Sequence, residues 1–385
     1  MLKRFEVCNY RIFKNTVVLD FSNVGGYKFN SDCTHEGLLS KIILYGRNAT
    51  GKTSLGRALQ DLFMEIIAGR NLSYCDDTYV LNADSDARKA LFRYEFVFDG
   101  QNLIYSYEKD ASNTLQREKI YVNDKLVVDM DFTKGVLAEI DINALEVEGL
   151  QVNRYLETIV SDKEGVALEE RHNMSFLRFL FNNAALTPDS LIYKLRDFIS
   201  KMRFSSTNRV NMPFTVISRL TDELSDRTRL DSFERFLNEM GIECKLCLRD
   251  LPDGRKDLCF KHHKLVPFYD NASSGTKKLT KLYFSFFAGM RNSSFIFMDE
   301  FDAFFHYEMA EKVVLYLKKY HPKTQVILTT HNTNLMNNHI MRPDCLMILS
   351  RDGRLTALCD ATERELREGH NLEKMYIAGE FERYE

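Results

Sequence analysis

The sequence predicts a soluble α/β protein with a mixed central sheet, an antiparallel β subdomain and an inserted helical lobe. Three observations support this fold class. The stretch KIILYGRNATGKTSLGRALQDLF runs from an apolar strand through a glycine loop into a helix with apolar residues at helical spacing. Between Phe92 and Val128, alternating runs are separated by Asp-Gly and Asn-Asp turns, which is typical of several short strands. From Asn143 to about Met240, apolar residues recur at helical spacing.

The composition is that of an ordinary globular protein. The 385 residues suffice for one large domain or two. A formal net charge of −3 gives no overall basic footprint for nucleic acid, although a local basic patch is compatible with it. No stretch approaches the roughly 20 apolar residues of a membrane span, and MLKRFEVCNY lacks the apolar core of a signal peptide. The eight cysteines then fit reduced thiols, and we expect a cytoplasmic protein without a membrane partner.

We expect residues 1–385 to form a single domain with three parts. Residues 1–142 contain an opening hairpin, the strand–loop–helix unit and the β subdomain. Residues 143–241 form the helical lobe, where Pro188 is expected at the start of a helix because its missing N–H does no harm there. Residues 242–385 return to strands and helices and carry the remaining motifs.

One cysteine pattern allows two interpretations. Cys244, Cys247, Cys259 and His262 have the spacing of zinc ligands. Two alternating runs also flank DLPDGRK, whose Pro-Asp-Gly is a turn signal, so the segment is typical of a β-hairpin. On a strand, residues three apart point to opposite faces, and Cys244 and Cys247 would diverge. We therefore favour the hairpin over the zinc site.

A complete phosphate-binding loop follows the strand KIILY. GRNATGKT fits the pattern G-x-x-x-x-G-K-[ST] and stands between a strand and a helix, as that motif requires. Backbone N–H groups of the loop and the helix start face an anion, Lys52 adds charge for the β- and γ-phosphates, and the Thr53 hydroxyl ligates Mg²⁺. We predict that ATP is bound by the following residues: Gly46, Arg47, Asn48, Ala49, Thr50, Gly51, Lys52, Thr53 and Ser54.

Two adjacent carboxylates follow the apolar run in SSFIFMDEFDAFFH. Charge at the end of a buried strand is costly unless it is compensated, and a bound cation is the first candidate. Asp299 is expected to hold the Mg²⁺ shell, and Glu300 to polarise the attacking water as general base. His331 ends VILTTH, another buried strand, and is expected to contact the γ-phosphate.

A serine- and glycine-containing segment precedes the acidic strand. NASSGTKKL opens a helix with Ser273, Ser274 and Gly275, and such a small-residue helix start suits an anion. An ordinary serine cap would use the same residues. Only the position of the segment, between the phosphate loop and the acidic strand, favours anion binding.

In this order, the motifs resemble an ABC-type ATPase head of the RecF/SMC/OLD group. The turn NYRIF is similar to the NFRSF-like amino-terminal hairpin of that group, which implies that Arg11 approaches the nucleotide. In such heads, two copies enclose two ATP molecules. The resemblance therefore implies a homodimer, open to higher oligomers, in which Ser273, Ser274 and Gly275 contact the γ-phosphate held by the other copy. Asp302 takes the place of the dimer-contacting D-loop.

The segments EFDAFFH, TTHNTNLM and LREGHNLEKMYIAGEF are similar to stand-alone OLD-like ATPases of bacterial antiphage systems, among them abortive-infection L and PARIS. There the ATPase is paired with a separate effector, which implies an ATP-driven sensor or scaffold that controls a toxin or nuclease. The alternative is a RecF-like DNA-binding repair protein, and nucleic acid is left open as a partner. KMRFSSTNR, residues 201–209, is the basic and aromatic candidate for DNA contact, but we expect a solvated connector there.

Overall fold

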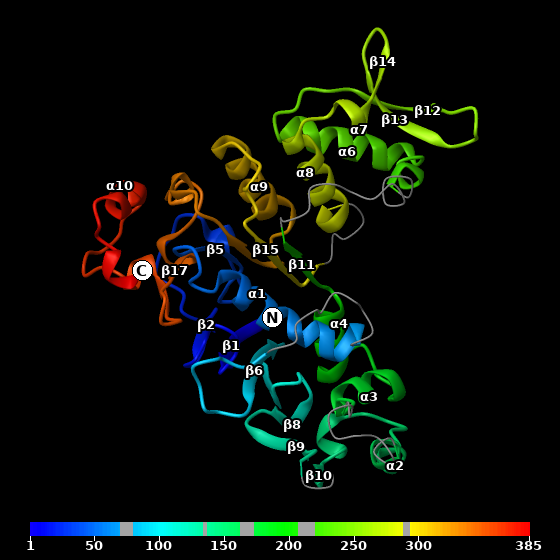
Figure 1. The fold of residues 1–385 in the computed structure, drawn as a ribbon, viewed down its shortest axis with the longest axis vertical. Coiled ribbons are helices and arrows are strands. Elements are labelled where there is room, and N and C mark those ends of the chain that lie inside the picture. The colour runs from blue at the N-terminus through cyan, green and yellow to red at the C-terminus, as the bar shows by residue number, and fades with distance from the viewer. Residues whose placement is uncertain (70–79, 134–136, 162–172, 207–219, 288–292) are drawn as a thin grey trace.

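A six-stranded sheet lies at the centre of the molecule (Figure 1). The computed structural model describes residues 1–69, 80–133, 137–161, 173–206, 220–287 and 293–385. In sheet order, the strands are β11 (Met202–Ser206), β15 (Phe295–Asp299), β16 (Gln325–Thr329), β5 (Lys41–Tyr45), β17 (Leu346–Leu349) and β18 (Leu355–Ala357). The first five run parallel and β18 is antiparallel, so the predicted mixed sheet is confirmed. β15, β16, β5 and β17 are buried along their whole length, as in parallel sheets covered on both faces.

A seven-stranded antiparallel sheet forms the predicted β subdomain. The predicted opening hairpin is confirmed, and β6 pairs with the other edge of its first strand. In sheet order, the strands are β10 (Leu137–Ile140), β9 (Lys125–Asp131), β8 (Leu115–Val122), β7 (Gln101–Lys109), β6 (Ala90–Phe98), β1 (Leu2–Cys8) and β2 (Val17–Asp20). A small two-stranded sheet, β3 (Thr34–His35) and β4 (Leu38–Leu39), precedes β5.

One amide side chain joins the two large sheets. Gln325, the first residue of β16, accepts a hydrogen bond from the backbone N–H of Leu2 through Oε1 (2.8 Å). Its Nε2 donates to the carbonyl oxygens of Leu2 (2.7 Å) and Leu39 (3.5 Å). Gln325 is fully buried, and its amide supplies partners that backbone groups need where two sheets meet away from water.

Helices cover the central sheet and form the helical lobe. In Figure 1, α2, α3 and α4 lie beside the antiparallel sheet, whereas α6, α7 and α8 gather near β12–β14. The helices are α1 (Lys52–Phe63), α2 (Val152–Ser161), α3 (Phe176–Asn183), α4 (Leu191–Ser200), α6 (Arg227–Glu239), α7 (Phe268–Asn271), α8 (Ser274–Leu282), α9 (Tyr307–Tyr320) and α10 (Leu372–Ile377). In the described ranges, no helix has the length and apolarity that crossing a bilayer requires.

Two details expected in and beside the lobe are wrong. Residues 202–206 are not a solvated connector, because they form β11, which pairs in parallel with β15; residues 207–209 lie outside the described part. Pro188 does not start a helix. α4 begins at Leu191, because the Ser190 side chain caps it by accepting a hydrogen bond from the Tyr193 N–H, which satisfies an otherwise unpaired donor.

The hairpin interpretation of the cysteine-containing segment is confirmed. β12 (Leu246–Asp250) pairs with β13 (Lys256–Lys261), and β14 (Leu265–Pro267) extends the sheet. Cys247 lies directly opposite Cys259, while Cys244 precedes the strand. Within the described residues, no three or more His, Cys, Asp or Glu side chains are grouped to hold a metal ion.

A buried lysine links the β subdomain to α1. Lys109, the last residue of β7, forms ion pairs with Asp61 of α1 (2.6 Å) and with Glu65 of the π-helical turn that follows it (2.9 Å). All three side chains are largely excluded from solvent. The buried ammonium charge of Lys109 is therefore compensated by two carboxylates of the same chain.

A buried carboxylate links the same subdomain to α3. Glu118 of β8 accepts hydrogen bonds from the backbone N–H groups of Phe176 and Leu177, at 2.8 and 3.0 Å, and from the hydroxyls of Ser175 and Tyr105, at 2.7 and 3.0 Å. Burial nonetheless raises the pKa of Glu118 above its usual range, because desolvation outweighs these hydrogen bonds. The carboxyl group supplies acceptors that the first turn of α3 needs.

Candidate functional site

The chain between β5 and α1 folds into a loop with its lysine turned inward. Gly51 has a φ of +105°, which favours glycine, and it immediately precedes α1. Lys52 is buried, and its Nζ donates to the carbonyl oxygens of Gly46 (2.7 Å) and Arg47 (3.2 Å). An anion bound to the loop's N–H groups would meet this ammonium. Of the other predicted loop residues, Thr50 is buried, Ser54 is half-buried, and three are exposed: Arg47, Asn48 and Ala49.

Two glycines allow the close packing around this loop. A Cβ on Gly51 would lie 2.6 Å from the ring of Phe13, so the turn that carries Phe13 packs directly on the loop. A Cβ on Gly56 would lie 2.3 Å from the ring of Phe297 in β15. Gly56 follows Thr53 by three residues and thus lies on the same face of α1. The start of α1 can therefore approach the acidic end of β15.

The first acid of the pair contacts the threonine of the phosphate loop. Asp299 Oδ2 accepts a hydrogen bond from the Thr53 hydroxyl at 2.7 Å, and Oδ1 accepts one from the Thr329 hydroxyl of β16, also at 2.7 Å. Mg²⁺ prefers oxygen donors of this kind. A hydroxyl and a carboxylate this close, beside a phosphate-binding loop, fit a magnesium site in which Thr53 and Asp299 are the ligands.

The second acid lies at the edge of the same cluster. The Glu300 backbone has a φ of +46°, and its N–H donates to the Thr329 hydroxyl at 2.7 Å. Because of this left-handed backbone conformation, the side chains of Glu300 and Asp299 point in different directions. Burial lowers the pKa of Lys52, and the carboxylates of Asp299 and Glu300 oppose that change, which places both acids within electrostatic reach of the ammonium.

His331 belongs to this cluster as well. Burial lowers the pKa of His331, the Lys52 ammonium lowers it further, and the carboxylates of Glu300, Asp302 and Asp299 oppose the shift. The imidazole is therefore neutral near pH 7 and can donate one hydrogen bond. The carboxylate of Asp302 accepts a hydrogen bond from the hydroxyl of Thr330, the residue before His331, at 2.6 Å.

The amino-terminal turn lies against the phosphate loop. Arg11 is half-buried with a φ of +50°, and its Nε donates to the Tyr10 hydroxyl at 3.1 Å. The turn is held by hydrogen bonds from the Arg11 N–H to the Val80 carbonyl (2.8 Å) and from the Asn82 side chain to the Arg11 carbonyl (2.7 Å). The backbone of Arg11 is thus fixed near Gly51 through its neighbour Phe13.

The Ser-Gly segment forms the start of α8. Ser273 is the N-cap, and its Oγ accepts a hydrogen bond from the Thr276 N–H at 3.1 Å. Ser273 and Ser274 are exposed and Gly275 is half-buried. A Cβ on Gly275 would lie 3.3 Å from the carbonyl oxygen of Phe304, so the loop after the acidic pair touches the start of this helix. The exposed serines leave the helix start open to a second molecule.

The carboxy-terminal segment also reaches the phosphate loop. Arg47 forms an ion pair with Glu385, with Nη2 and Oε2 2.7 Å apart. α10 approaches the strand end that carries His331, because the Thr333 hydroxyl donates to Glu373 at 3.2 Å. The carboxy-terminal segment thus packs against the head at both the phosphate loop and the end of β16.

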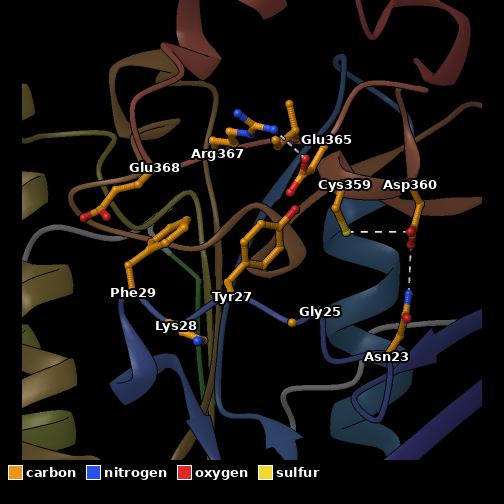
Figure 2. A pocket seen from close by; sticks show the side chains of 12 residues that line it. Asn23, Gly25, Tyr27, Lys28, Phe29, Cys359, Asp360, Glu365, Arg367 and Glu368 are labelled. Atoms are coloured by element: carbon orange, nitrogen blue, oxygen red, sulfur yellow. Dashed lines mark hydrogen bonds and ion pairs between the residues drawn. The ribbon is translucent and has the colours of Figure 1, made fainter.

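A pocket of about 560 Å³ lies at the opposite end of the central sheet (Figure 2). The rings of Tyr27 and Phe29 line it, and Asn23 donates to Asp360 at 2.8 Å along its rim. β18 is antiparallel to β17, so its last residue, Ala357, lies beside the amino end of β17. β17 is parallel to β5, and the phosphate loop follows the carboxyl end of β5, at the opposite edge of the sheet. This pocket is therefore separate from the cluster around Lys52.

Sequence reasoning missed the residue that organises the acidic pair. Thr329 donates to the Asp299 carboxylate and accepts from the Glu300 N–H, so it fixes both acids. The signal available was the Thr-Thr pair at the end of the apolar strand QVIL. Because β16 is parallel to β15 and next to it, polar residues at the carboxyl end of β16 lie beside the acids at the carboxyl end of β15.

The sequence family described as "AAA domain, putative AbiEii toxin, Type IV TA system" matches residues 41–337. This range begins with β5 and ends after His331, so it includes the phosphate loop, the start of α8 and the acidic pair. No curated protein sequence matches the chain.

Several solved structures with similar folds are SMC heads. The SMC head domain from Thermotoga maritima is 16% identical with a TM-score of 0.45, over 92% of this chain and 98% of that one. The Pyrococcus furiosus Smc head with an extended coiled coil, bound to the C-terminal domain of ScpA, is 15% identical with a TM-score of 0.47, over 99% of each chain. The Pyrococcus yayanosii Smc head with a coiled coil and joint is 13% identical with a TM-score of 0.48, over 94% and 98%.

Proposed function

The chain belongs to this AAA-domain family of P-loop proteins, and from that premise we propose that it binds and hydrolyses ATP with Mg²⁺ as a dimer. The dimer acts as a nucleotide-driven sensor or scaffold that controls a separate effector, a toxin or nuclease, in bacterial antiphage defence. The observation that carries the ATPase proposal is the hydrogen bond of 2.7 Å between Thr53 at the start of α1 and Asp299 at the end of β15. It joins the phosphate loop to the acidic pair at one point.

Each residue of the cluster has a role in this reaction. The loop N–H groups and Lys52 bind the phosphates, and binding draws the ammonium away from the Gly46 and Arg47 carbonyls. Thr53 and Asp299 would hold Mg²⁺, which supplies charge neutralisation at the β- and γ-phosphates when bound. Glu300 accepts a proton from water as the water oxygen bonds to the γ-phosphorus and the bond to the ADP oxygen breaks.

His331 complements this charge distribution. A neutral imidazole donates a hydrogen bond to a γ-phosphate oxygen without adding a charge beside Lys52. Arg11, whose backbone is fixed next to the loop, would reach the same nucleotide from the other side.

We propose that a second copy completes each site. Ser273, Ser274 and Gly275 at the start of α8 would contact the γ-phosphate held in the other subunit, where the helix dipole favours negative charge. ATP binding then favours the closed dimer and hydrolysis favours the open one, and this two-state behaviour is what an effector can read.

The family description names a putative toxin of a type IV toxin–antitoxin system, which supports a two-component system; that the toxin or nuclease is a protein separate from this ATPase is our proposal. The DNA-repair alternative loses its candidate contact in part, because residues 202–206 are committed to β11. A pull-down from the native host with a tagged, ATP-locked variant tests the choice. A stoichiometric protein partner supports the proposal, whereas nucleotide-dependent DNA binding with a steep salt dependence supports the alternative.

Glu300→Gln tests the ATPase mechanism. This variant should still bind ATP, lose turnover by about 100-fold or more, and accumulate the ATP-bound dimer, because only the proton acceptor is removed. ATP affinity by fluorescent nucleotide titration, phosphate release and sedimentation measure the three properties. Lys52→Ala is the matched control and should lose ATP binding itself. Hydrolysis by Glu300→Gln at the unaltered rate would place the general base elsewhere.

A further inference from the structure

Buried lysines in the described part of the chain have internal acceptors, with one exception. The exception is Lys278 of α8, which is 4% exposed and whose Nζ has no hydrogen-bond partner among the described residues. The partnered buried lysines are Lys41, bound to the Thr324 carbonyl; Lys52, bound to the Gly46 carbonyl; Lys109, paired with Asp61 and Glu65; and Lys318, bound to Asn30 and the Ile340 carbonyl.

The surroundings of Lys278 do not compensate its charge. Its Nζ lies 5.8 Å from the centroid of the Phe304 ring, a contact that stabilises a cation only weakly. Burial and, to a smaller extent, the positive charge of Lys281 together lower the pKa of Lys278 to about 8. An ammonium group without acceptors inside a protein is costly. A chain that pairs its other buried lysines gains nothing for its fold from this one.

Lys278 lies on the same face of α8 as the exposed Ser-Gly start of the helix, where an anion could approach it. Lys278 follows Ser274 by four residues and Gly275 by three, so the three lie on one face of α8. Long side chains on a helix lean towards its N-terminus, here the exposed Ser-Gly start. Phe304 covers the ammonium, but its own side chain is 42% exposed and stands on the loop that touches Gly275. A second molecule docking on this helix start would meet Phe304 first.

We propose that Lys278 is a phosphate-binding residue that acts across the dimer, under a cover formed by Phe304. Docking moves the Phe304 ring aside, and the ammonium then binds the terminal phosphate of the ATP held in the other copy's phosphate loop. This inference rests on the proposed ATP-bridged dimer. Lys278 would add a charged contact to the terminal phosphate. Without it, only serine hydroxyls and backbone N–H groups of the α8 start would bind that phosphate.

Lys278→Met in the Glu300→Gln background is the first test. Methionine keeps most of the volume and removes the charge. The dissociation constant of the ATP-dependent dimer, measured by sedimentation, should therefore rise by about tenfold or more. Thermal unfolding of the nucleotide-free variant should be unchanged or shifted upward, since a buried unpaired charge is gone. Lys278→Arg should recover part of the dimer affinity. Lys281→Met, which removes the same charge farther along α8, is the matched control and should leave the dimer intact.

Mixing subunits distinguishes action across the dimer from action within a subunit. A heterodimer of Lys52→Ala and Lys278→Met retains one site in which an intact loop meets an intact Lys278, but only if Lys278 serves the other copy's nucleotide. With both proteins otherwise unaltered, the ATPase activity of the mixture should therefore exceed that of either variant alone. Absence of recovery, or equal dimer affinity in Lys278→Met and its parent, overturns the inference. Failure of the Glu300→Gln parent to dimerise with ATP instead refutes the proposed function.

Discussion

Lys109 and Lys278 are both buried, but they lie in regions that treat charge in opposite ways. At the junction of the β subdomain with α1, Lys109 lies 2.6 Å from Asp61 and 2.9 Å from Glu65. At the start of α8, Lys278 has no acceptor among the described residues. The charge of Lys109 is compensated by carboxylates of the same chain, whereas the charge of Lys278 is left, in our proposal, for a ligand to compensate.

The acids follow the same division. Glu118 has four hydrogen-bond donors, two of them backbone groups that cannot move without disrupting α3. Asp299 has two donors, both hydroxyls that can rotate towards other partners. A carboxylate held by rotatable groups can exchange them for a metal ion at little cost.

The largest expected effect is on stability. Lys109→Met leaves two buried carboxylates without their cation and should lower the free energy of unfolding by about 3–5 kcal/mol, as measured by urea denaturation. Lys278→Met should not lower it. Equal losses in the two variants would erase the distinction between the two regions.

A smaller effect concerns pH. The pKa of Glu118 is raised in the folded state, so the folded protein keeps a proton that the unfolded chain releases. The contribution of this group to stability therefore falls as pH rises from its unfolded pKa through its folded pKa, with a limiting slope of about 1.4 kcal/mol per pH unit. The stability advantage of the unaltered protein over Glu118→Gln should shrink accordingly between acidic and neutral pH. An advantage that grows with pH would mean that hydrogen bonding outweighs burial.

The smallest effect is expected at the exposed ion pair. Glu385→Gln releases Arg47 from its partner, and because Arg47 is open to solvent the thermal unfolding midpoint should not change. ATP affinity should rise by no more than about fivefold and the gain should vanish in high salt, since Arg47 becomes free to face the triphosphate. A drop in ATP affinity would instead assign Glu385 a supporting role in the loop.

The sequence was sufficient where a motif is continuous along the chain. Strand, glycine loop and helix around Lys52 are neighbours in sequence, and the apolar run before Asp299 specifies its own strand, so both were predictable. Contacts set by tertiary packing were not. Thr329 reaches Asp299 only because β16 lies beside β15, and the isolation of Lys278 depends on which groups do not surround it. Residues 202–206 lack the apolar run of the other central strands because they form an edge.

β16 has consequences beyond its own hydrogen bonds. Its last residue, Thr329, holds both acids of the site, and its first residue, Gln325, is bonded to the opening strand of the other sheet. The five residues of β16 thus connect the acidic pair to the junction between the two large sheets. In the proposed ATPase cycle, a shift of these acids would act through β16 on the contact between Gln325 and Leu2, and so on the attachment of the β subdomain.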